Sequence, residues 1–235
     1  MSAEIIGNKG PLVVALHGIQ GTCAAWRPIA MMLDGRARFV LPNLRGRGDA
    51  LRGRTVQDYG LPAFADDVRQ VIARQVPAGV PYYVAGWSMG VSVALEWLAA
   101  AGGPLPRGLI LASGTPCLAQ VRWFDGEGDA LLANVAERQR RLGLVQAADP
   151  DAVALTWQAI RDGDQRPLLP GVRLPTLVVH GRDDDDCPWP LAQELAAGIA
   201  GARLLLLDGV GRGVLAQATR PVADAMNDFI TELET

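Results

Sequence analysis

Short apolar runs alternate with longer stretches of helical periodicity along most of the chain, and this alternation limits the possible folds more than any other feature. A strand that is apolar on both sides needs helices over both faces, as the strands of a parallel sheet have. We therefore predict an α/β fold with a mostly parallel sheet flanked by helices. The expected strands are residues 12–16, 38–41, 82–85, 108–112, 174–179 and 203–207, and the expected helices are 24–33, 62–75, 89–101, 191–200 and 221–232.

One segment, residues 117–171, interrupts the alternation. It carries no strand pattern, its apolar residues recur at helical spacing, and it predicts two or three helices. An insertion between two core strands at the edge where ligands bind is typical of a lid. We therefore divide the chain into a core (1–116 and 172–235) and a small helical cap (117–171). The few residues before the first strand allow one edge strand.

The composition excludes several classes of function. A net charge of −3 gives no basic surface for nucleic acid, and no apolar run is long enough to span a membrane. The start of the chain lacks the features of a signal peptide, so we expect a soluble, cytoplasmic protein. Its three cysteines form no C-x-x-C motif and are interpreted as small buried side chains. With two histidines, and acidic residues that are adjacent in sequence, no metal site is predicted.

Ser88 is the strongest candidate for a functional residue. It lies in the sequence Gly-Trp-Ser-Met-Gly, residues 86–90, between a predicted strand and a predicted helix. Such a turn exposes the serine hydroxyl, and the helix directs its first free N–H groups towards the same point. Gly86 and Gly90 lack the Cβ atoms that would crowd the turn. The pattern predicts a nucleophilic serine.

These residues resemble those of the α/β-hydrolase superfamily, and the resemblance covers nearly the whole chain. Within it, the chain is similar to BioH-type esterases, which cleave the methyl ester of a pimeloyl group on acyl carrier protein, a step of biotin biosynthesis. The shared residues are Leu16-His17-Gly18, Trp26-Arg27, the 86–90 turn, Ala112-Ser113 and Pro116-Cys117.

The resemblance assigns the rest of the site. It implies an oxyanion hole formed by the backbone N–H groups of Ile19 and Met89, with His17 bracing its loop. In residues 180–188, a G-x-x-D pattern followed by proline identifies Asp184 as the triad acid, and the neighbouring aspartates are interpreted as a solvated loop. The family's base histidine should follow the strand at 203–207. Arg212 occupies that position.

Arginine at position 212 has a severe chemical consequence. A guanidinium group does not release its proton near neutral pH, so Arg212 cannot act as a general base. It can pair with Asp184 in a bidentate manner and fix the loop, or donate to an anion beside Ser88. The sequence leaves open whether the histidine was replaced in a working enzyme, whether the chemistry is non-hydrolytic, or whether the protein only binds ligands.

The favoured hypothesis is that the chain descends from carboxylic ester or thioester hydrolases and that its hydrolytic activity is impaired or lost in the present sequence. The alternatives are a lyase or cyclase, and a ligand-binding pseudoenzyme. Trp26, Trp87 and the cap are expected to form an apolar acyl pocket, and no cofactor is implied. The substrate would be a small acyl ester or one carried on acyl carrier protein. Three arginines of the cap, at 138, 140 and 141, can meet such an acidic carrier, although a solvated helix face is the simpler interpretation.

Overall fold

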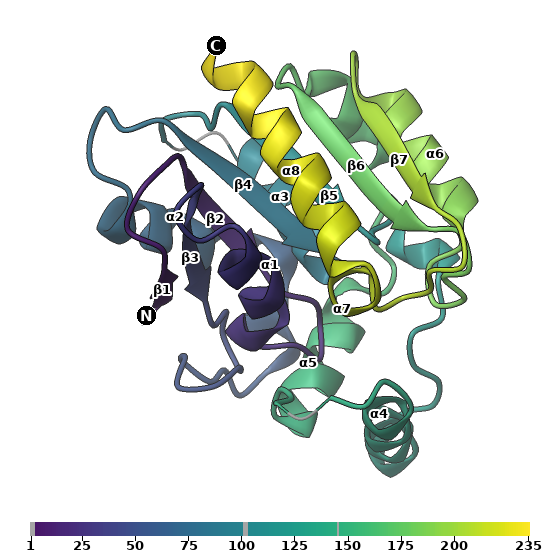
Figure 1. Ribbon diagram of the computed structural model, residues 1–235. Coiled ribbons are helices and arrows are strands. Elements are labelled where there is room, and N and C mark those ends of the chain that lie inside the picture. Colours follow the sequence, from purple (N-terminus) through teal and green to yellow (C-terminus); the bar gives the residue numbers. More distant parts are fainter. Residues whose placement is uncertain (1–2, 101–102, 145) are drawn as a thin grey trace.

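A computed structural model describes residues 3–100, 103–144 and 146–235 and shows a seven-stranded sheet (Figure 1). The strand order is β1-β3-β2-β4-β5-β6-β7. Only β1 runs antiparallel to its neighbour, and all other pairs are parallel. This confirms the predicted fold class. The strands are β1 (Ala3–Ile6), β2 (Leu12–Leu16), β3 (Arg38–Pro42), β4 (Tyr82–Trp87), β5 (Gly108–Ala112), β6 (Thr176–Gly181) and β7 (Arg203–Leu207).

The central strands are fully buried, as their apolar sequences predict. Two of them extend further than the apolar pattern indicates. β4 continues to Trp87, which pairs with Ala112, and β6 continues to Gly181, which pairs with Leu207. In both cases the neighbouring strand supplies ladder partners, so backbone hydrogen bonding prolongs the strand beyond its apolar run.

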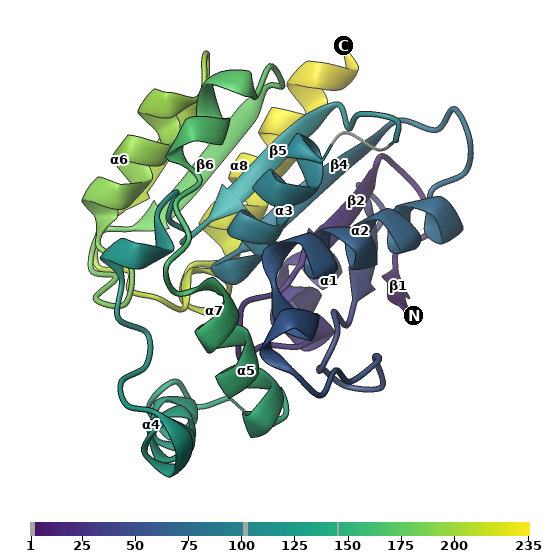
Figure 2. The same cartoon turned by 180° about the vertical axis from the view of Figure 1, so that it is seen from behind.

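Helices cover both faces of the sheet, as Figures 1 and 2 show from opposite sides. Helices α1 and α8 pack on one face, and α2, α3 and α6 pack on the other. Each buries an apolar stripe against the sheet. The helices of the core are α1 (Arg27–Met32), α2 (Leu61–Gln75), α3 (Met89–Ala99), α6 (Trp189–Gly198), α7 (Val214–Gln217) and α8 (Thr219–Glu234).

Three expected helices match α2, α6 and α8 to within two residues at each end, and the stretch expected at 24–33 differs more. The stretch expected at 24–33 is a short 3-10 turn, Cys23–Trp26, followed by α1, which begins where Pro28 occupies its second position. The helix expected to reach 101 ends with α3 at Ala99, and position 101 lies outside the described residues. Pro28 fixes a helical φ and needs no amide donor, so it favours the start of α1 after the 3-10 turn.

The segment expected to form the cap contains α4 (Gly128–Arg141), α5 (Pro150–Ile160) and 3-10 turns at Leu118–Gln120 and Arg166–Gly171. Both α4 and α5 lie beyond the carboxyl ends of β4 and β6 (Figures 1 and 2). An antiparallel bridge between Cys117 and Asp164 joins the two ends of the segment. The helices are thus placed over the carboxyl edge of the sheet, where the Ser88 turn also lies.

Two further findings concern the cysteines and the length of the apolar helices. Cys23, Cys117 and Cys187 are free thiols and buried, as predicted. Among the described residues, no helix is long and apolar enough to cross a membrane.

Candidate active site

Ser88 occupies the sharp turn between β4 and α3. Its φ of 59° and ψ of −122° lie outside the regions that residues with a side chain normally adopt. The turn is held by its neighbours, because the Ser88 amide donates to the carbonyl of Ala112 and the Ser88 carbonyl accepts from Val91. Such strain persists only where the surroundings impose it, and it is concentrated at functional sites. The predicted strand-turn-helix setting of Ser88 is therefore present.

The two glycines of the turn are required by close backbone contacts. A Cβ at Gly86 would lie 2.4 Å from the carbonyl oxygen of Gly90. A Cβ at Gly90 would lie 2.4 Å from the carbonyl oxygen of Leu16. Neither oxygen can move without displacing a strand or a helix, so the turn allows no side chain at these positions.

The loop after β2 fixes the orientation of the Ile19 amide. The carbonyl of Gly18, in the same peptide group, accepts from the Gly21 amide at 3.1 Å and from Nδ1 of His17 at 2.9 Å. In a trans peptide the N–H points opposite to the C=O, so the Ile19 N–H is held in one direction. The Met89 N–H is fixed in the same way, because the Ser88 carbonyl of its peptide is bound by Val91.

His17 braces this loop and is not placed to act as a base. Its Nε2 accepts the Leu44 amide at 3.0 Å, so both ring nitrogens are used and the neutral form is fixed. Complete burial, together with the charge of Arg47, lowers the pKa of His17 to about 3. The bracing role inferred from the sequence is confirmed.

Arg47 belongs to the site, although no sequence pattern singled it out. It is fully buried, and its guanidinium donates to the carbonyl of Ile19 at 2.5 Å and to Oγ1 of Thr156 at 3.1 Å. It thereby ties the loop after β2, which is the expected oxyanion loop, to helix α5 of the segment expected to form the cap. Burial lowers the pKa of Arg47 to about 10, which still leaves it charged near neutral pH.

Asp184 is buried in the turn after β6 and is fixed by the backbone. Its Oδ1 accepts the amides of Asp186 at 3.1 Å and of Cys187 at 2.9 Å. Its Oδ2 accepts from Nη1 of Arg212 at 3.3 Å. The expected contact between Arg212 and Asp184 is therefore present. A bidentate pair does not form, because the two amides already occupy Oδ1.

Arg212 links the acid to the serine. Its Nη2 donates to Ser88 Oγ, and its Nη1 also donates to the carbonyl of Ser113 at 2.6 Å. Ser113 has a φ of 44°, a conformation that is rare for a residue with a side chain. It follows β5, and its carbonyl is a third anchor for the guanidinium. The sequence did not indicate this role for Ser113.

The surroundings hold Arg212 as a cation. Its side chain is 4% exposed and lies between two indole rings, 5.3 Å from the centroid of Trp123 and 5.9 Å from that of Trp87. Burial alone would lower the pKa of Arg212, but the charges of Asp184 and Asp186 outweigh it and the pKa is raised. A group in this state can donate hydrogen bonds to Ser88, and it cannot accept the serine proton.

His180 lies behind Asp184 and is not placed to act as a base towards Ser88. Its Nε2 is 2.7 Å from the Cys187 carbonyl, to which it donates, and 3.6 Å from Oδ2 of Asp184. Its Nδ1 is buried and has no hydrogen-bond partner within the described residues. Burial lowers the pKa of His180. In the described part of the chain no hydrogen bond joins His180 to Ser88, which contacts Arg212 instead.

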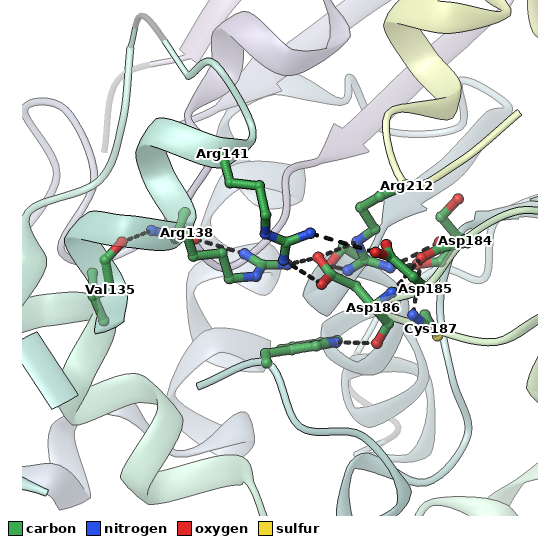
Figure 3. Close-up of polar contacts among 12 residues, drawn as sticks. Val135, Arg138, Arg141, Asp184, Asp185, Asp186, Cys187 and Arg212 are labelled. Carbon is green, nitrogen blue, oxygen red and sulfur yellow. Dashed lines mark hydrogen bonds and ion pairs between the residues drawn. The ribbon is translucent and has the colours of Figure 1, made fainter. Parts of the chain in front are cut away.

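A second charged cluster joins the cap to the acid loop. Asp186 accepts from Arg138 at 2.5 Å and from Arg141 at 2.7 Å, and both arginines belong to helix α4 (Figure 3). Arg138 also donates to Gln20 of the oxyanion loop at 2.6 Å. Burial tends to raise the pKa of Asp186, but the guanidinium groups dominate and lower it.

This cluster corrects two interpretations made from the sequence. Asp186 is buried and does not belong to a solvated loop, and Arg138, at 5% exposure, does not lie on a solvated helix face. The sequence carried a signal, because Arg138 follows Leu131 and Val135 at helical spacing and so falls on the buried stripe of α4. Of the three cap arginines, Arg140 is the most exposed, at 73%, and pairs with Glu137, whereas Arg141 is 46% exposed although it contacts Asp186.

The expectation for Trp26 is wrong. Its side chain is 0% exposed, and its indole donates to the carbonyl of Leu16 at 2.9 Å. The ring packs in the core beneath the oxyanion loop, where it satisfies a backbone carbonyl at the end of β2 and is not available to a ligand. Trp87, in contrast, lines a cleft.

That cleft has a volume of about 380 Å³ and lies between the core and the cap. Its walls include Ala24, Trp87, Leu144, Arg212 and Leu215. A smaller cavity of about 10 Å³ adjoins Ser88 and shares Trp87, Leu144 and Arg212 with the cleft wall. Ser88 itself is 3% exposed and lines only the smaller cavity of the two. The volume of the cleft is within the range of about 300–1,000 Å³ that is usual for small-molecule sites.

Among the residues that the structure describes, no group of three or more His, Cys, Asp or Glu side chains is placed to hold a metal ion. The polar groups of the site are instead the serine hydroxyl, two guanidinium groups, two carboxylates and oriented backbone amides. Such an arrangement can stabilise developing negative charge on an oxygen beside Ser88.

Comparison with known proteins agrees with this geometry. The sequence pattern of the Alpha/beta hydrolase family matches residues 13–225. The chain belongs to the alpha/beta hydrolase family. Among solved structures, it is similar to an esterase from Exiguobacterium antarcticum, with a TM-score of 0.81 and 23% sequence identity, covering 97% of this chain and 94% of that one.

Curated relatives include esterases. The chain is 25% identical to the AB hydrolase superfamily protein YisY of Bacillus subtilis, over 96% of this chain and 93% of that protein. It is 32% identical to the pimeloyl-[acyl-carrier protein] methyl ester esterase of Aeromonas hydrophila, over 80% of this chain and 82% of that protein. A third relative, 32% identical over 60% of this chain, is the 2-succinyl-6-hydroxy-2,4-cyclohexadiene-1-carboxylate synthase of Salmonella heidelberg.

Proposed function

We propose that the chain is a carboxylic ester or thioester hydrolase by descent, in which Arg212 has taken the place of the catalytic base and impairs turnover. Ser88 is the nucleophile, Asp184 the acid, and Ile19 and Met89 the oxyanion donors. The observation that carries the proposal is the contact of Arg212 with both Ser88 Oγ and Asp184. The guanidinium occupies the position between acid and nucleophile that a base would need.

The contact with Arg212 opposes nucleophilic attack. A hydroxyl becomes a good nucleophile when a neighbouring base takes its proton as the new bond forms. Arg212 donates to Ser88 Oγ, so it engages a lone pair of the serine and offers no acceptor for the proton. The oriented amides of Ile19 and Met89 remain, and these supply part of the rate enhancement even without a base.

The substrate follows from the cleft and from the relatives. The cleft wall is formed largely by small and apolar side chains, which suits an acyl chain. Relatives include esterases named for an ester on acyl carrier protein. A small acyl ester or a carrier-linked ester is therefore the proposed substrate. Because Arg138 and Arg141 are bound to Asp186, Arg140 is the arginine of this group that is best exposed to an acidic carrier.

A ligand-binding protein without turnover is the second candidate. It is favoured by the enclosure of Ser88, which the cap and Arg212 cover, beside an open cleft. A lyase or cyclase, in which Arg212 stabilises a carboxylate or an enolate, is the third, and a synthase among the relatives favours it.

Replacement of Arg212 by histidine tests the proposal. Hydrolysis of p-nitrophenyl acetate and p-nitrophenyl octanoate is measured for the unaltered chain and for Arg212→His. If the base alone is missing, the variant should gain about 10²–10⁴-fold in kcat, the usual contribution of a general base. Ser88→Ala in the Arg212→His protein should abolish the gain.

A matched control is Arg182→His. Arg182 follows β6, is exposed, and pairs with Asp208 away from Ser88. An equal gain in this variant would show that an added surface histidine hydrolyses the ester, and it would remove the support for the proposal. No gain from Arg212→His with either ester contradicts it directly and favours the binding protein.

A further inference from the structure

Residues that line the small cavity beside Ser88 carry hydrogen-bond donors without partners in the described part of the chain. Arg138 lines the cavity, and its Nε is buried without a partner among the described residues. Ser88 Oγ accepts from Arg212, which leaves its own O–H free to donate. A buried donor without a partner costs about 1–3 kcal/mol, so a ligand that supplies an acceptor would be stabilised here.

Several oxygen atoms of the oxyanion loop are, in contrast, already occupied. The Gly18 carbonyl is bound by His17 and Gly21, and the Gln20 carbonyl by Ala148. The side-chain oxygen of Gln20 accepts from Arg138. The cavity therefore suits a ligand group that accepts hydrogen bonds and has none to donate.

The charges around the cavity favour a negative group. Two buried guanidinium groups, those of Arg138 and Arg212, line the cavity wall. Burial, together with the repelling charge of Arg212, lowers the pKa of Arg138 to about 10. With Arg141, three guanidinium groups face the buried carboxylates of Asp184 and Asp186 (Figure 3). Asp186 lies 2.5 Å from Arg138 and 3.9 Å from Arg212, but two buried carboxylates against three guanidinium groups leave one positive charge that an anion would balance.

The size of the two spaces limits the ligand. The cavity of about 10 Å³ accommodates one oxygen-sized group, since a water needs about 10–15 Å³ on this scale. It shares Trp87, Leu144 and Arg212 with the wall of the 380 Å³ cleft, so the two spaces are adjacent, and the proposed ligand has one oxygen in the cavity and its remainder in the cleft. The cleft offers apolar side chains such as Ala24 and Leu215 to the rest of the ligand.

We propose that the unaltered chain binds an aliphatic monocarboxylate, with one carboxylate oxygen in the cavity between Arg138, Arg212 and Ser88 and the apolar tail in the cleft. This inference uses the location of the site in the proposed function, but it requires no turnover. The acid is held as a ligand by the arginine that displaces the base. Binding and hydrolysis can therefore succeed or fail separately.

Isothermal titration with octanoate and with 1-octanol tests the proposal on the unaltered chain. The tails are matched, and only the head group differs. Because hydrogen bonds between the carboxylate and the charged guanidinium groups stabilise the complex, octanoate should bind with a Kd at least about tenfold lower than that of 1-octanol. Equal affinities for the two ligands would overturn the proposal, as would no binding of octanoate at millimolar concentration. This comparison does not depend on the folding of any variant.

Variants then locate the head group. Arg138→Gln and Arg212→Gln should each reduce octanoate affinity about tenfold or more and leave octanol binding within about twofold. Arg140→Gln is the matched control, because Arg140 lies on the same helix but is 73% exposed and pairs with Glu137. Circular dichroism confirms that each variant is folded. If Arg140→Gln weakens binding as much as Arg138→Gln, the helix carries only a general charge effect and the assigned site is wrong.

The tail is tested separately. Ala24→Phe places a ring in the cleft at a distance from the charged cluster. It should weaken octanoate about tenfold while changing acetate binding less than twofold. Loss of both ligands, or of neither, would contradict the placement of the tail in the cleft. Esterase activity of Arg212→His is the independent measurement for the proposed function, so failure of one proposal is distinguishable from failure of the other.

Discussion

Asp186→Leu should destabilise the protein strongly, because it leaves the Arg138 guanidinium buried without its carboxylate. The two side chains are 7% and 6% exposed and lie 2.5 Å apart. Removal of one partner of a buried ion pair costs about 3–5 kcal/mol in unfolding free energy. The nearby positive charge of Arg212, which already opposes the charged form of Arg138, acts in the same direction.

The expected loss can be measured by urea unfolding and by thermal melting. For a chain of this length, about 1 kcal/mol corresponds to roughly 2–4 °C, so Tm should fall by about 6–20 °C. Asp185→Leu is the control. Asp185 is the neighbouring residue, is 76% exposed, and lies 3.6 Å from Arg141, so its removal should change stability by no more than about 0.5 kcal/mol.

A double variant separates the lost pair from other effects. In Arg138→Met with Asp186→Leu, no buried charge is left alone, and such replacements are often neutral or stabilising. In this double variant the side-chain oxygen of Gln20 loses its donor, Arg138, which lowers the free energy of unfolding by about 1–3 kcal/mol. The double variant should still be more stable than Asp186→Leu alone. A loss below about 1 kcal/mol in Asp186→Leu, or equal losses at 185 and 186, would refute the assigned role of the pair.

The remaining predictions concern the turn and the pH dependence. Gly90→Ala should lower the yield of folded protein and cost at least about 2 kcal/mol, because its Cβ would meet the Leu16 carbonyl at 2.4 Å; an unchanged denaturation midpoint would contradict this. His17 has a folded pKa of about 3, below its unfolded value of 6.5, so the unfolded chain binds more protons and stability should fall as pH decreases from about 6.5 towards 3. Urea unfolding between pH 7 and 4 should show a slope of up to about 1.4 kcal/mol per pH unit for this group, and the same slope in His17→Gln would refute the assignment.

The sequence determined the elements of the core and the identity of the turn. Apolar strands that need cover on both faces predicted the parallel sheet, and this pattern depends on local composition alone. The glycines at 86 and 90 predicted the tight turn at Ser88 because few other residues can take part in it. The family resemblance, followed in order along the chain, also predicted that Arg212 occupies the position of the base histidine.

Only the tertiary structure decided what the charged residues and the tryptophans do. Asp186 and Arg138 are 48 positions apart, and no local pattern pairs them. Helical spacing can place Arg138 on a buried face, but only the folding of α4 over the acid loop decides that it meets Asp186 there. Trp26 and Trp87 are both apolar in sequence, yet one supports the core and the other lines the cleft. Periodicity along a chain reports which face of an element is buried. It does not report which groups from distant elements meet there, and burial, ion pairing and ligand access all depend on those meetings.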